Sequence, residues 1–229
     1  NVLDEDSIER LKQACPYLDI TLHPDPDIDA AFVWPNFAVE ERLNQHPRLR
    51  WIQLLSAGYD KVDIASVHAR GIYLTNARHV NSIPIAEDII ARILYFNRDM
   101  HLYTKDQQLG RWEPRQNAYE LYQSTVGILG AGSIATHTAE RLKSFHTRIL
   151  CYRQNEINIS HFDQCFRGPD GLKTLLQQSD YVIVCLPLNA ETKCLLNRDT
   201  LSYMKKDALL INIARGDIID EEALVDVLE

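Results

Sequence analysis

A short glycine-rich stretch carries the clearest chemical signal in this 229-residue sequence. It reads Gly127-Ile-Leu-Gly130-Ala-Gly132-Ser-Ile-Ala135, which has the spacing G-x-G-x-x-A. Gly130 permits a tight turn, Gly132 lets the backbone approach a pyrophosphate, and Ala135 allows a helix to pack closely on a strand. The spacing alone also fits an ordinary strand–helix turn. Because an apolar strand precedes it and a helical stretch follows, we predict a dinucleotide site at a helix N-terminus.

An arginine stands where many dinucleotide-binding units have an acidic residue. About 20 residues beyond the glycines, at the end of the next strand, an Asp or Glu would bind the adenosine ribose. This sequence has Tyr152-Arg153-Gln154 there and no acidic residue before Glu156. Arg153 can pair with a 2′-phosphate, so we predict NADP(H) as the cofactor, with NAD(H) still possible. The alternative is a solvated arginine at the end of a strand.

The glycine-rich stretch and Arg153 both need an α/β unit in which short apolar strands alternate with amphipathic helices. In the second half of the chain, the predicted strands are Val126–Leu129, Arg148–Tyr152, Tyr181–Leu186 and Ala208–Ile213. The predicted helices between and after them are Ile134–Ser144, Leu172–Gln178, Arg198–Met204 and Glu221–Leu228.

A first set of strands and helices of the same kind precedes this one. Its predicted strands are Tyr17–Leu22, Ala30–Trp34, Trp51–Leu55 and Ile72–Thr75, and its predicted helices are Ser7–Ala14, Ala38–Asn44 and Val62–Ala69. The small-residue turn Ser56-Ala57-Gly58 follows the third of these strands.

Apolar residues at helical spacing predict one long helix from Ser82 to about Leu109, followed by an aromatic loop over residues 110–122. A helix of this length would link two lobes or support a contact between subunits. The predicted fold is α/β, with two Rossmann-like lobes, one flavodoxin-like and one dinucleotide-binding, whose parallel sheets are joined by this interdomain helix. We assign residues 1–96 to the N-terminal part of a substrate-binding domain. Residues 97–229 form an NAD(P)-binding domain that we expect to be incomplete at its C-terminal end.

Five motifs occur in the order found in one enzyme family. They are Leu55–Asp60, Asn81–Glu87, Gly127–Ala135, Asp180–Thr192 and Met204–Gly216. Together they resemble the D-isomer-specific 2-hydroxyacid dehydrogenases, which include glyoxylate/hydroxypyruvate reductases, D-lactate dehydrogenases and phosphoglycerate dehydrogenases. The resemblance runs from about residue 16 to the last residue.

The resemblance implies roles for individual residues. Arg215 matches the family's catalytic arginine, whose guanidinium would hold the carboxylate of a 2-oxo acid and polarise its keto oxygen. The amides of Ala57 and Gly58 would bind the substrate carboxylate, although an ordinary strand-end turn also explains these small residues. The residues implied in cofactor binding are Gly130, Gly132, Ser133, Ile134, Arg153, Leu186, Pro187, Thr192, Ile213 and Ala214.

The same resemblance implies a proton-donating histidine, held by a glutamate, downstream of Arg215. The sequence ends at Glu229 within a predicted amphipathic helix, and all eight histidines precede residue 162. One expectation is that the sequence is a piece of a longer dehydrogenase. The other is a naturally short product that binds nucleotide but does not complete the hydride cycle.

Three functions follow from these residues and this resemblance. The leading expectation is an NADP(H)-preferring reductase of a small 2-oxo acid, such as glyoxylate or hydroxypyruvate. An NAD-dependent D-lactate or phosphoglycerate dehydrogenase is the nearest alternative, and Arg153 argues against it. The third is a non-catalytic, corepressor-like relative that senses nucleotide and binds partner proteins. The resemblance also implies a homodimer.

The composition restricts the partners and the compartment. The net charge of −8 disfavours nucleic acid and anionic membrane surfaces as partners. Five cysteines without a C-x-x-C pair indicate reduced thiols in the cytoplasm. The histidines are not at metal-ligand spacing, so we expect no metal site.

Overall fold

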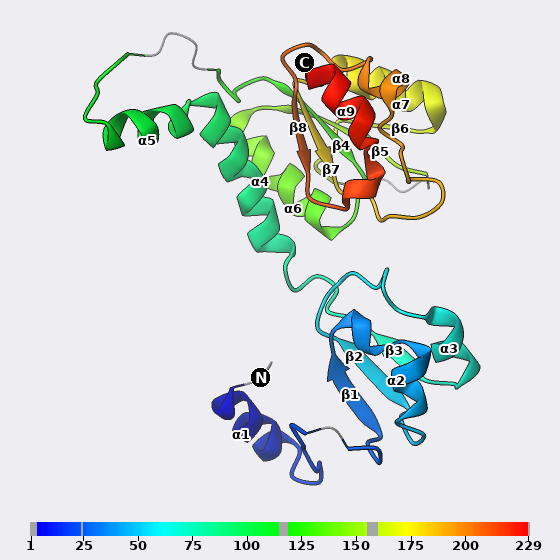
Figure 1. The fold of residues 1–229 in the computed structure, drawn as a ribbon. Helices are drawn as coiled ribbons and strands as arrows, with labels where there is room; N and C mark the ends of the chain where they lie inside the picture. Colours follow the sequence, from blue (N-terminus) through cyan, green and yellow to red (C-terminus); the bar gives the residue numbers. More distant parts are fainter. Residues whose placement is uncertain (1–3, 24, 115–118, 155–159, 229) are drawn as a thin grey trace. The chain divides into compact units, whose positions relative to one another are not determined.

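The computed structural model describes residues 4–23, 25–114, 119–154 and 160–228 of the chain. The chain divides into two compact units, Asn1–Arg78 and His79–Glu229, and Figure 1 shows the elements of each. The sequence placed a domain boundary after residue 96. In the structure the segment from His79 onward belongs to the second unit, because the helix that follows packs against the second sheet.

The second unit is built on a five-stranded sheet in the order β6-β5-β4-β7-β8, with every neighbouring pair parallel. Its strands are β4 (Thr125–Leu129), β5 (Arg148–Tyr152), β6 (Gln164–Phe166), β7 (Tyr181–Val184) and β8 (Leu209–Asn212). Along the chain, β5 and β6 are added on one side of β4, and β7 and β8 are then added on its other side. This reversal between β4 and β7 creates the crevice in which such sheets bind their ligands.

Helices cover both faces of this sheet. One face carries α4 (Ser82–Asn97) and α6 (Ser133–Leu142), and the other carries α7 (Gly168–Gln178), α8 (Arg198–Leu201) and α9 (Glu221–Leu228). Two short 3₁₀ turns, η2 (Lys143–Phe145) and η3 (Gly216–Ile218), lie between these elements. Among the helices of the described residues, none is long and apolar enough to cross a membrane.

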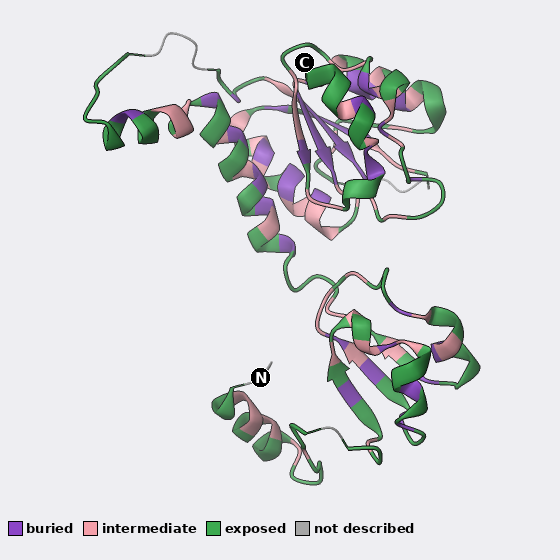
Figure 2. Cartoon of the chain, viewed as in Figure 1, coloured by how far each residue is buried: buried purple, intermediate pink, exposed green. Residues whose placement is uncertain are grey.

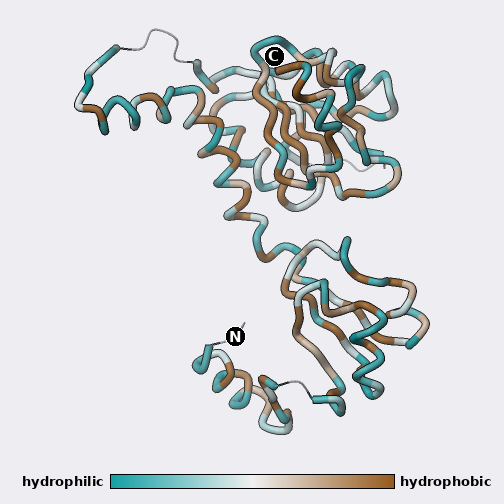
Figure 3. The backbone as a smooth tube through the Cα atoms, viewed as in Figure 1, coloured by the Kyte–Doolittle hydropathy of each residue, from teal (hydrophilic) through white to brown (hydrophobic). Residues whose placement is uncertain are grey.

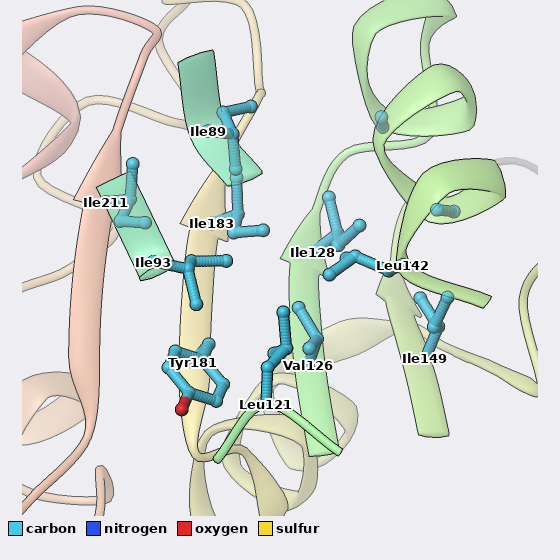
Figure 4. Packing of buried hydrophobic residues seen from close by; sticks show 12 residues of the cluster. Ile89, Ile93, Leu121, Val126, Ile128, Leu142, Ile149, Tyr181, Ile183 and Ile211 are labelled. Atoms are coloured by element: carbon cyan, nitrogen blue, oxygen red, sulfur yellow. The ribbon is translucent and has the colours of Figure 1, made fainter. Parts of the chain in front are cut away.

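Because both faces are covered, the central strands are apolar throughout instead of alternating. All four residues of β7 are buried, and the strands of this sheet form the buried centre of the unit in Figure 2. The same strands are mostly brown, the colour of hydrophobic residues, in Figure 3. Figure 4 shows Ile89 and Ile93 of α4 beside Ile183 and Ile211 of the sheet.

The single long helix predicted from Ser82 to Leu109 is wrong. Helix α4 ends at Asn97, and a separate helix α5 spans Met100–Gln108. Between them Asp99 has φ of 50°, in the left-handed region that Asp tolerates better than most residues. The apolar spacing continues across this break from Phe96 to Met100, so periodicity could not reveal it. The segment therefore forms two helices instead of one, and its role as an interdomain helix stays a prediction.

The first unit is a smaller sheet with the order β1-β2-β3, also parallel. Its elements are α1 (Glu5–Ala14), β1 (Ala30–Val33), η1 (Pro35–Phe37), α2 (Glu40–Asn44), β2 (Trp51–Leu54), α3 (Ile64–Ala69) and β3 (Tyr73–Thr75). Leu43 of α2 and Val67 of α3 pack with Ile52 on one face of the sheet. The other face exposes Phe32 and Tyr73 within the described residues.

The strand predicted at Tyr17–Leu22 is wrong, because these residues are irregular in the structure. Tyr17 is 84% exposed, and Leu18 and Leu22 are also exposed. A short apolar run becomes a strand only when a neighbouring strand satisfies its backbone groups. The first strand position of this sheet is taken instead by β1, which pairs with β2.

One partly exposed charge contact fixes the edge of the larger sheet. The Asp163 carboxylate accepts hydrogen bonds from Ile149 N at 2.6 Å and from Lys143 Nζ at 2.7 Å. Desolvation of the partly buried carboxyl raises its pKa. The bonds from Ile149 and Lys143 outweigh this effect and hold the pKa below its ordinary value. The charged carboxylate therefore stabilises the fold above about pH 4, and this contribution is lost as the pH falls through the lowered pKa.

We predict that Asp163→Asn lowers the free energy of unfolding by about 1–2 kcal/mol at pH 7, which is the scale of a charged hydrogen bond reduced by partial exposure. The difference from the parent protein should shrink below pH 4. Urea denaturation at pH 7 and at pH 3.5 measures both quantities. Asp207→Asn, at an exposed position, is the matched control. A loss that is the same at both pH values would contradict the assigned role.

Candidate functional site

The carboxyl ends of four parallel strands are joined by backbone hydrogen bonds. Gly130 N donates to Tyr152 O at 2.8 Å, which ties the turn after β4 to the end of β5. On the other side of β4, Cys185 N donates to Leu129 O at 2.8 Å. Ile213 N donates to Val184 O at 3.3 Å and adds the segment after β8. The glycine turn, Arg153, the loop from residue 186 and the segment before Arg215 therefore share one edge of the sheet.

Gly130 and Gly132 differ in the structural reason for which the turn has a glycine. Gly130 has φ of 110°, and an added Cβ would lie 3.0 Å from the Cys185 carbonyl oxygen. At Gly132 an added Cβ would meet no heavy atom within 4 Å. Gly130 is therefore required by the fold, whereas Gly132 leaves open space beside the backbone.

Helix α6 begins directly after this open space. Its N-cap is Gly132, a residue without a side chain to cap the first-turn amides. Ser133 and Ile134 therefore present backbone amides and the positive end of a helix dipole where an anion can approach. Ala135 is fully buried against the sheet, as the spacing of the motif predicts.

Sequence reasoning missed the role of Gly127. An added Cβ there would lie 2.2 Å from Ser179 Oγ and 2.5 Å from Leu175 Cδ2, so this glycine lets α7 pack directly on β4. The signal was present, because Gly127 precedes the G-x-G pair by three residues within the strand.

Arg153 follows the last residue of β5, and its backbone N donates to Phe166 O at 3.1 Å. Its side-chain atoms Nε and Nη1 are buried and have no hydrogen-bond partner among the residues that the structure describes. A buried guanidinium without a partner is costly, and such groups usually have an anionic ligand or ordered water. A fully solvated arginine does not match this geometry.

The loop after β7 is closed by its own side chains. Thr192 Oγ1 donates to Pro187 O at 2.7 Å and accepts from Asn189 N at 2.8 Å. Gln154, next to Arg153, donates to the Glu191 carboxylate and so connects this loop to the end of β5. The Thr192 hydroxyl is thus engaged inside the loop that holds Leu186 and Pro187.

Arg215 lies in the exposed segment after β8, as its position behind an apolar strand predicts. Its Nη1 donates to Ala214 O at 2.9 Å. Asn212, which sequence reasoning did not single out, accepts from Ala214 N at 2.9 Å and donates to Arg215 O at 2.8 Å. Asn212 therefore fixes the backbone from which the arginine extends.

The turn predicted to bind a carboxylate lies in the first unit, after β2. Its carbonyl groups are held in place: Asn76 Nδ2 donates to Ala57 O at 2.8 Å, and Ser56 Oγ donates to Gly58 O at 2.8 Å. Ala77 N also donates to Ser56 O at 3.1 Å. These bonds fix the carbonyl groups of the turn, and carboxylate binding by the amides of Ala57 and Gly58 stays a prediction. Asn76 is a further residue that the sequence did not point to.

A hollow of about 500 Å³ lies elsewhere in the second unit, lined among others by Phe96, Asp180, Lys205 and Leu209. Asp180 and Leu209 stand at the amino ends of β7 and β8. The hollow is therefore at the opposite edge of the sheet from the glycine turn and is not part of the site described above.

A parallel sheet that reverses its strand order beside such a glycine turn defines a dinucleotide-binding α/β unit. Residues 90–229 match the family model described as D-isomer specific 2-hydroxyacid dehydrogenase, NAD binding domain. The chain therefore belongs to the D-isomer specific 2-hydroxyacid dehydrogenase family, as its five motifs predicted.

Curated relatives agree with this membership. The chain is 34% identical over 223 residues to a glyoxylate reductase of Pyrococcus horikoshii, covering 92% of this chain and 66% of that protein. It is 32% identical to a D-3-phosphoglycerate dehydrogenase of Synechocystis, covering 89% of this chain and 37% of that protein. The chain thus spans slightly less than two thirds of the glyoxylate reductase.

Solved structures share the fold. An acyclic imino acid reductase solved with NADPH and D-arginine has a TM-score of 0.85 at 25% identity, covering 99% of this chain and 75% of that one. A D-lactate dehydrogenase of Aquifex aeolicus, solved with NAD and lactic acid, has a TM-score of 0.83 at 24% identity. The latter match covers 99% of this chain and 72% of that one.

The two glycines give a direct test of the turn. We predict that Gly130→Ala lowers the free energy of unfolding by about 2 kcal/mol or more, because a side chain is strained in the left-handed region and meets a backbone carbonyl. Gly132→Ala should stay within about 1 kcal/mol of the parent, since its backbone is extended and the space is open. Urea denaturation of both variants measures the difference, and equal losses would contradict this geometry.

Proposed function

We propose that this chain binds NADP(H) at the carboxyl edge of the larger sheet and belongs to a reductase of a small 2-oxo acid. The observation that carries the cofactor choice is that two atoms of the Arg153 guanidinium, Nε and Nη1, are buried and have no hydrogen-bond partner among the described residues. Arg153 lies one residue beyond Tyr152, whose carbonyl accepts the hydrogen bond from the glycine turn. A 2′-phosphate would supply the two acceptors that Nε and Nη1 need.

The rest of the proposed site follows the same edge. The amides of Ser133 and Ile134 would bind the pyrophosphate over the open space at Gly132. We assign the nicotinamide end to the segments after β7 and β8, and the residues proposed there are Leu186, Pro187, Thr192, Ile213 and Ala214. Thr192 would act by holding this loop in shape, because its hydroxyl is already bonded to Pro187 O. The bound cofactor supplies the hydride.

Residues for substrate binding are proposed in each unit separately. Arg215 carries a planar cationic fork that can bind a carboxylate through two bonds and stabilise charge on the keto oxygen. In the first unit, the amides of Ala57 and Gly58 are proposed to bind a carboxylate. In the family resemblance a histidine held by a glutamate donates the proton, and no histidine follows His161 in this sequence.

Two other functions are alternatives to this proposal. An NAD-linked D-lactate or phosphoglycerate dehydrogenase would need a ribose-binding acid at the position of Arg153, and the sequence has none there. A nucleotide-sensing, corepressor-like relative would bind the dinucleotide without turning over a 2-oxo acid. The relatives named glyoxylate reductase favour the first proposal.

The assembly and the compartment are also proposals. We propose a homodimer that uses the exposed apolar residues around α5, which include Tyr95, Met100, Leu109 and Trp112. Exposed apolar residues gathered on one segment commonly mark a protein interface. All five cysteines are unpaired, which fits a reducing compartment such as the cytoplasm.

We predict that Arg153→Gln raises the KM for NADPH about 10- to 100-fold, since charged hydrogen bonds to a phosphate contribute about 1.5–3 kcal/mol. The KM for NADH should change less than threefold, because NADH has no 2′-phosphate. Steady-state kinetics of the complete natural polypeptide with both cofactors measures this. Arg148→Gln, at the exposed opposite end of β5, is the matched control. Equal changes for both cofactors would remove Arg153 from cofactor selection.

We predict that Arg215→Lys lowers kcat for 2-oxo acid reduction by about 100-fold, because an ammonium cannot reproduce the planar two-bond contact. NADPH oxidation with glyoxylate, hydroxypyruvate, pyruvate and phosphohydroxypyruvate measures both the activity and its substrate. Tight NADPH binding without turnover of any acid in the parent protein would favour the sensor function. Turnover in the variant close to that of the parent would exclude Arg215 from the mechanism.

A further inference from the structure

Two cysteines face each other across the edge of the larger sheet. Cys151 of β5 and Cys165 of β6 are direct partners in the parallel register. Neighbouring strands are about 4.7–4.9 Å apart, and disulfides form at Cα separations of about 4.4–6.8 Å. Both cysteines are unpaired in the structure. The backbone therefore already holds the two thiols at a separation that a disulfide can bridge.

The two thiols differ in access to solvent. Cys165 is exposed on the edge strand, whereas Cys151 is fully buried. Burial raises the pKa of the Cys151 thiol, and a hydrogen bond with Cys165 raises it further. An oxidant in solution can reach Cys165, and the second thiol lies directly behind it. This is the arrangement of an attacking cysteine and a resolving cysteine.

This pair adjoins the arginine proposed to select the cofactor. Arg153 follows the end of β5 two residues after Cys151. The nearby guanidinium charge acts on Cys151 and partly offsets the rise in its pKa. Arg153 N also donates to the carbonyl of Phe166, the residue after Cys165. A change in the spacing of the two cysteines would therefore be transmitted to Arg153 through one backbone bond.

We propose that Cys151 and Cys165 form a redox site, in which a peroxide converts the dithiol reversibly into a disulfide that weakens NADPH binding at Arg153. The disulfide itself depends only on the geometry of β5 and β6. Its effect on NADPH rests on the proposed function of Arg153.

The oxidation balances with hydrogen peroxide as the oxidant. The Cys165 thiolate attacks one peroxide oxygen, the O–O bond breaks, and a sulfenic acid and hydroxide form. The Cys151 sulfur then attacks the Cys165 sulfur, the S–O bond breaks, and the departing oxygen leaves as water with the proton of Cys151. The two thiols lose two electrons and two protons, and the peroxide is reduced to two waters. A dithiol such as dithiothreitol reverses the change by exchange.

The expected effect on Arg153 comes from a changed spacing of the bridged residues. A disulfide most often has a Cα separation of about 5.5–6 Å, whereas neighbouring strands lie about 4.7–4.9 Å apart. Strand β6 spans only Gln164–Phe166, so it gives way more easily than the central strands. Its movement would shift the Phe166 carbonyl that fixes the backbone of Arg153.

The first experiment maps the bond. The complete natural polypeptide is treated with hydrogen peroxide, alkylated and digested. The masses of its peptides are then measured by mass spectrometry before and after reduction with dithiothreitol. We expect a peptide pair linked through Cys151 and Cys165, 2 Da lighter than the two thiols and restored by the reductant. Cys165→Ser should abolish this species, and Cys194→Ser, at another exposed cysteine, should leave it unchanged. A linkage to any other cysteine, or only higher oxidation of Cys165, would overturn the proposal.

The second experiment measures NADPH binding by fluorescence titration of the reduced and the oxidised protein. We expect oxidation to raise the Kd about tenfold, or by about 1.4 kcal/mol, and Cys165→Ser to be insensitive to peroxide. A mapped disulfide with an unchanged Kd would overturn the proposed effect of the disulfide on NADPH binding at Arg153. If the reduced protein does not bind NADPH, the proposed function fails, while the peptide map still decides whether the redox site exists.

Discussion

The close approach of the turn after β4 to the end of β7 is the constraint on which the larger unit depends. Gly130 has a left-handed backbone conformation. A Cβ at this residue would lie 3.0 Å from the Cys185 carbonyl oxygen. The Gly130 amide also donates a hydrogen bond to Tyr152 O, at the end of β5. One residue without a side chain therefore brings three strand ends together. Every group of the candidate cofactor site is placed relative to this junction.

Buried strands were predictable because a short run of residues that is apolar on both faces fits only one environment. A run such as Tyr181–Val184 is apolar on both faces, so it must lie inside a parallel sheet covered by helices. The glycine turn was predictable for a related reason, since few folds need such small residues at that spacing. Strand β6 was not predicted, because Gln164-Cys165-Phe166 is short and lies at the edge, where partial exposure removes the apolar signal.

The errors in the fold have one physical origin. Periodicity reports which side of a segment is apolar and says little about whether the backbone is continuous or paired. It could not detect the left-handed residue Asp99 between α4 and α5. It also could not show that Tyr17–Leu22 lacks a neighbouring strand among the described residues. Both outcomes are decided by tertiary contacts that a single sequence does not display.

The candidate site was predictable in its residue types and not in its hydrogen bonds. Arg153 and Arg215 could be located from the strands they follow, whereas the burial of Nε and Nη1 of Arg153 is a tertiary property. Thr192 was singled out for the cofactor, yet its hydroxyl closes its own loop. Residues that support the site, such as Asn212 and Gln154, bond to neighbouring loops and leave no motif.

The adenosine end of the proposed site is built on the weakest part of the sheet. Arg153 is fixed by the carbonyl of Phe166, which belongs to a three-residue edge strand. That edge is held from its other end by the Asp163 carboxylate, which bonds to Ile149 N and Lys143. Edge segments open locally with less free energy than a buried core. In the proposed function, cofactor selection would be coupled to the local stability of β6, because any process that loosens or tightens this strand acts on the backbone of Arg153.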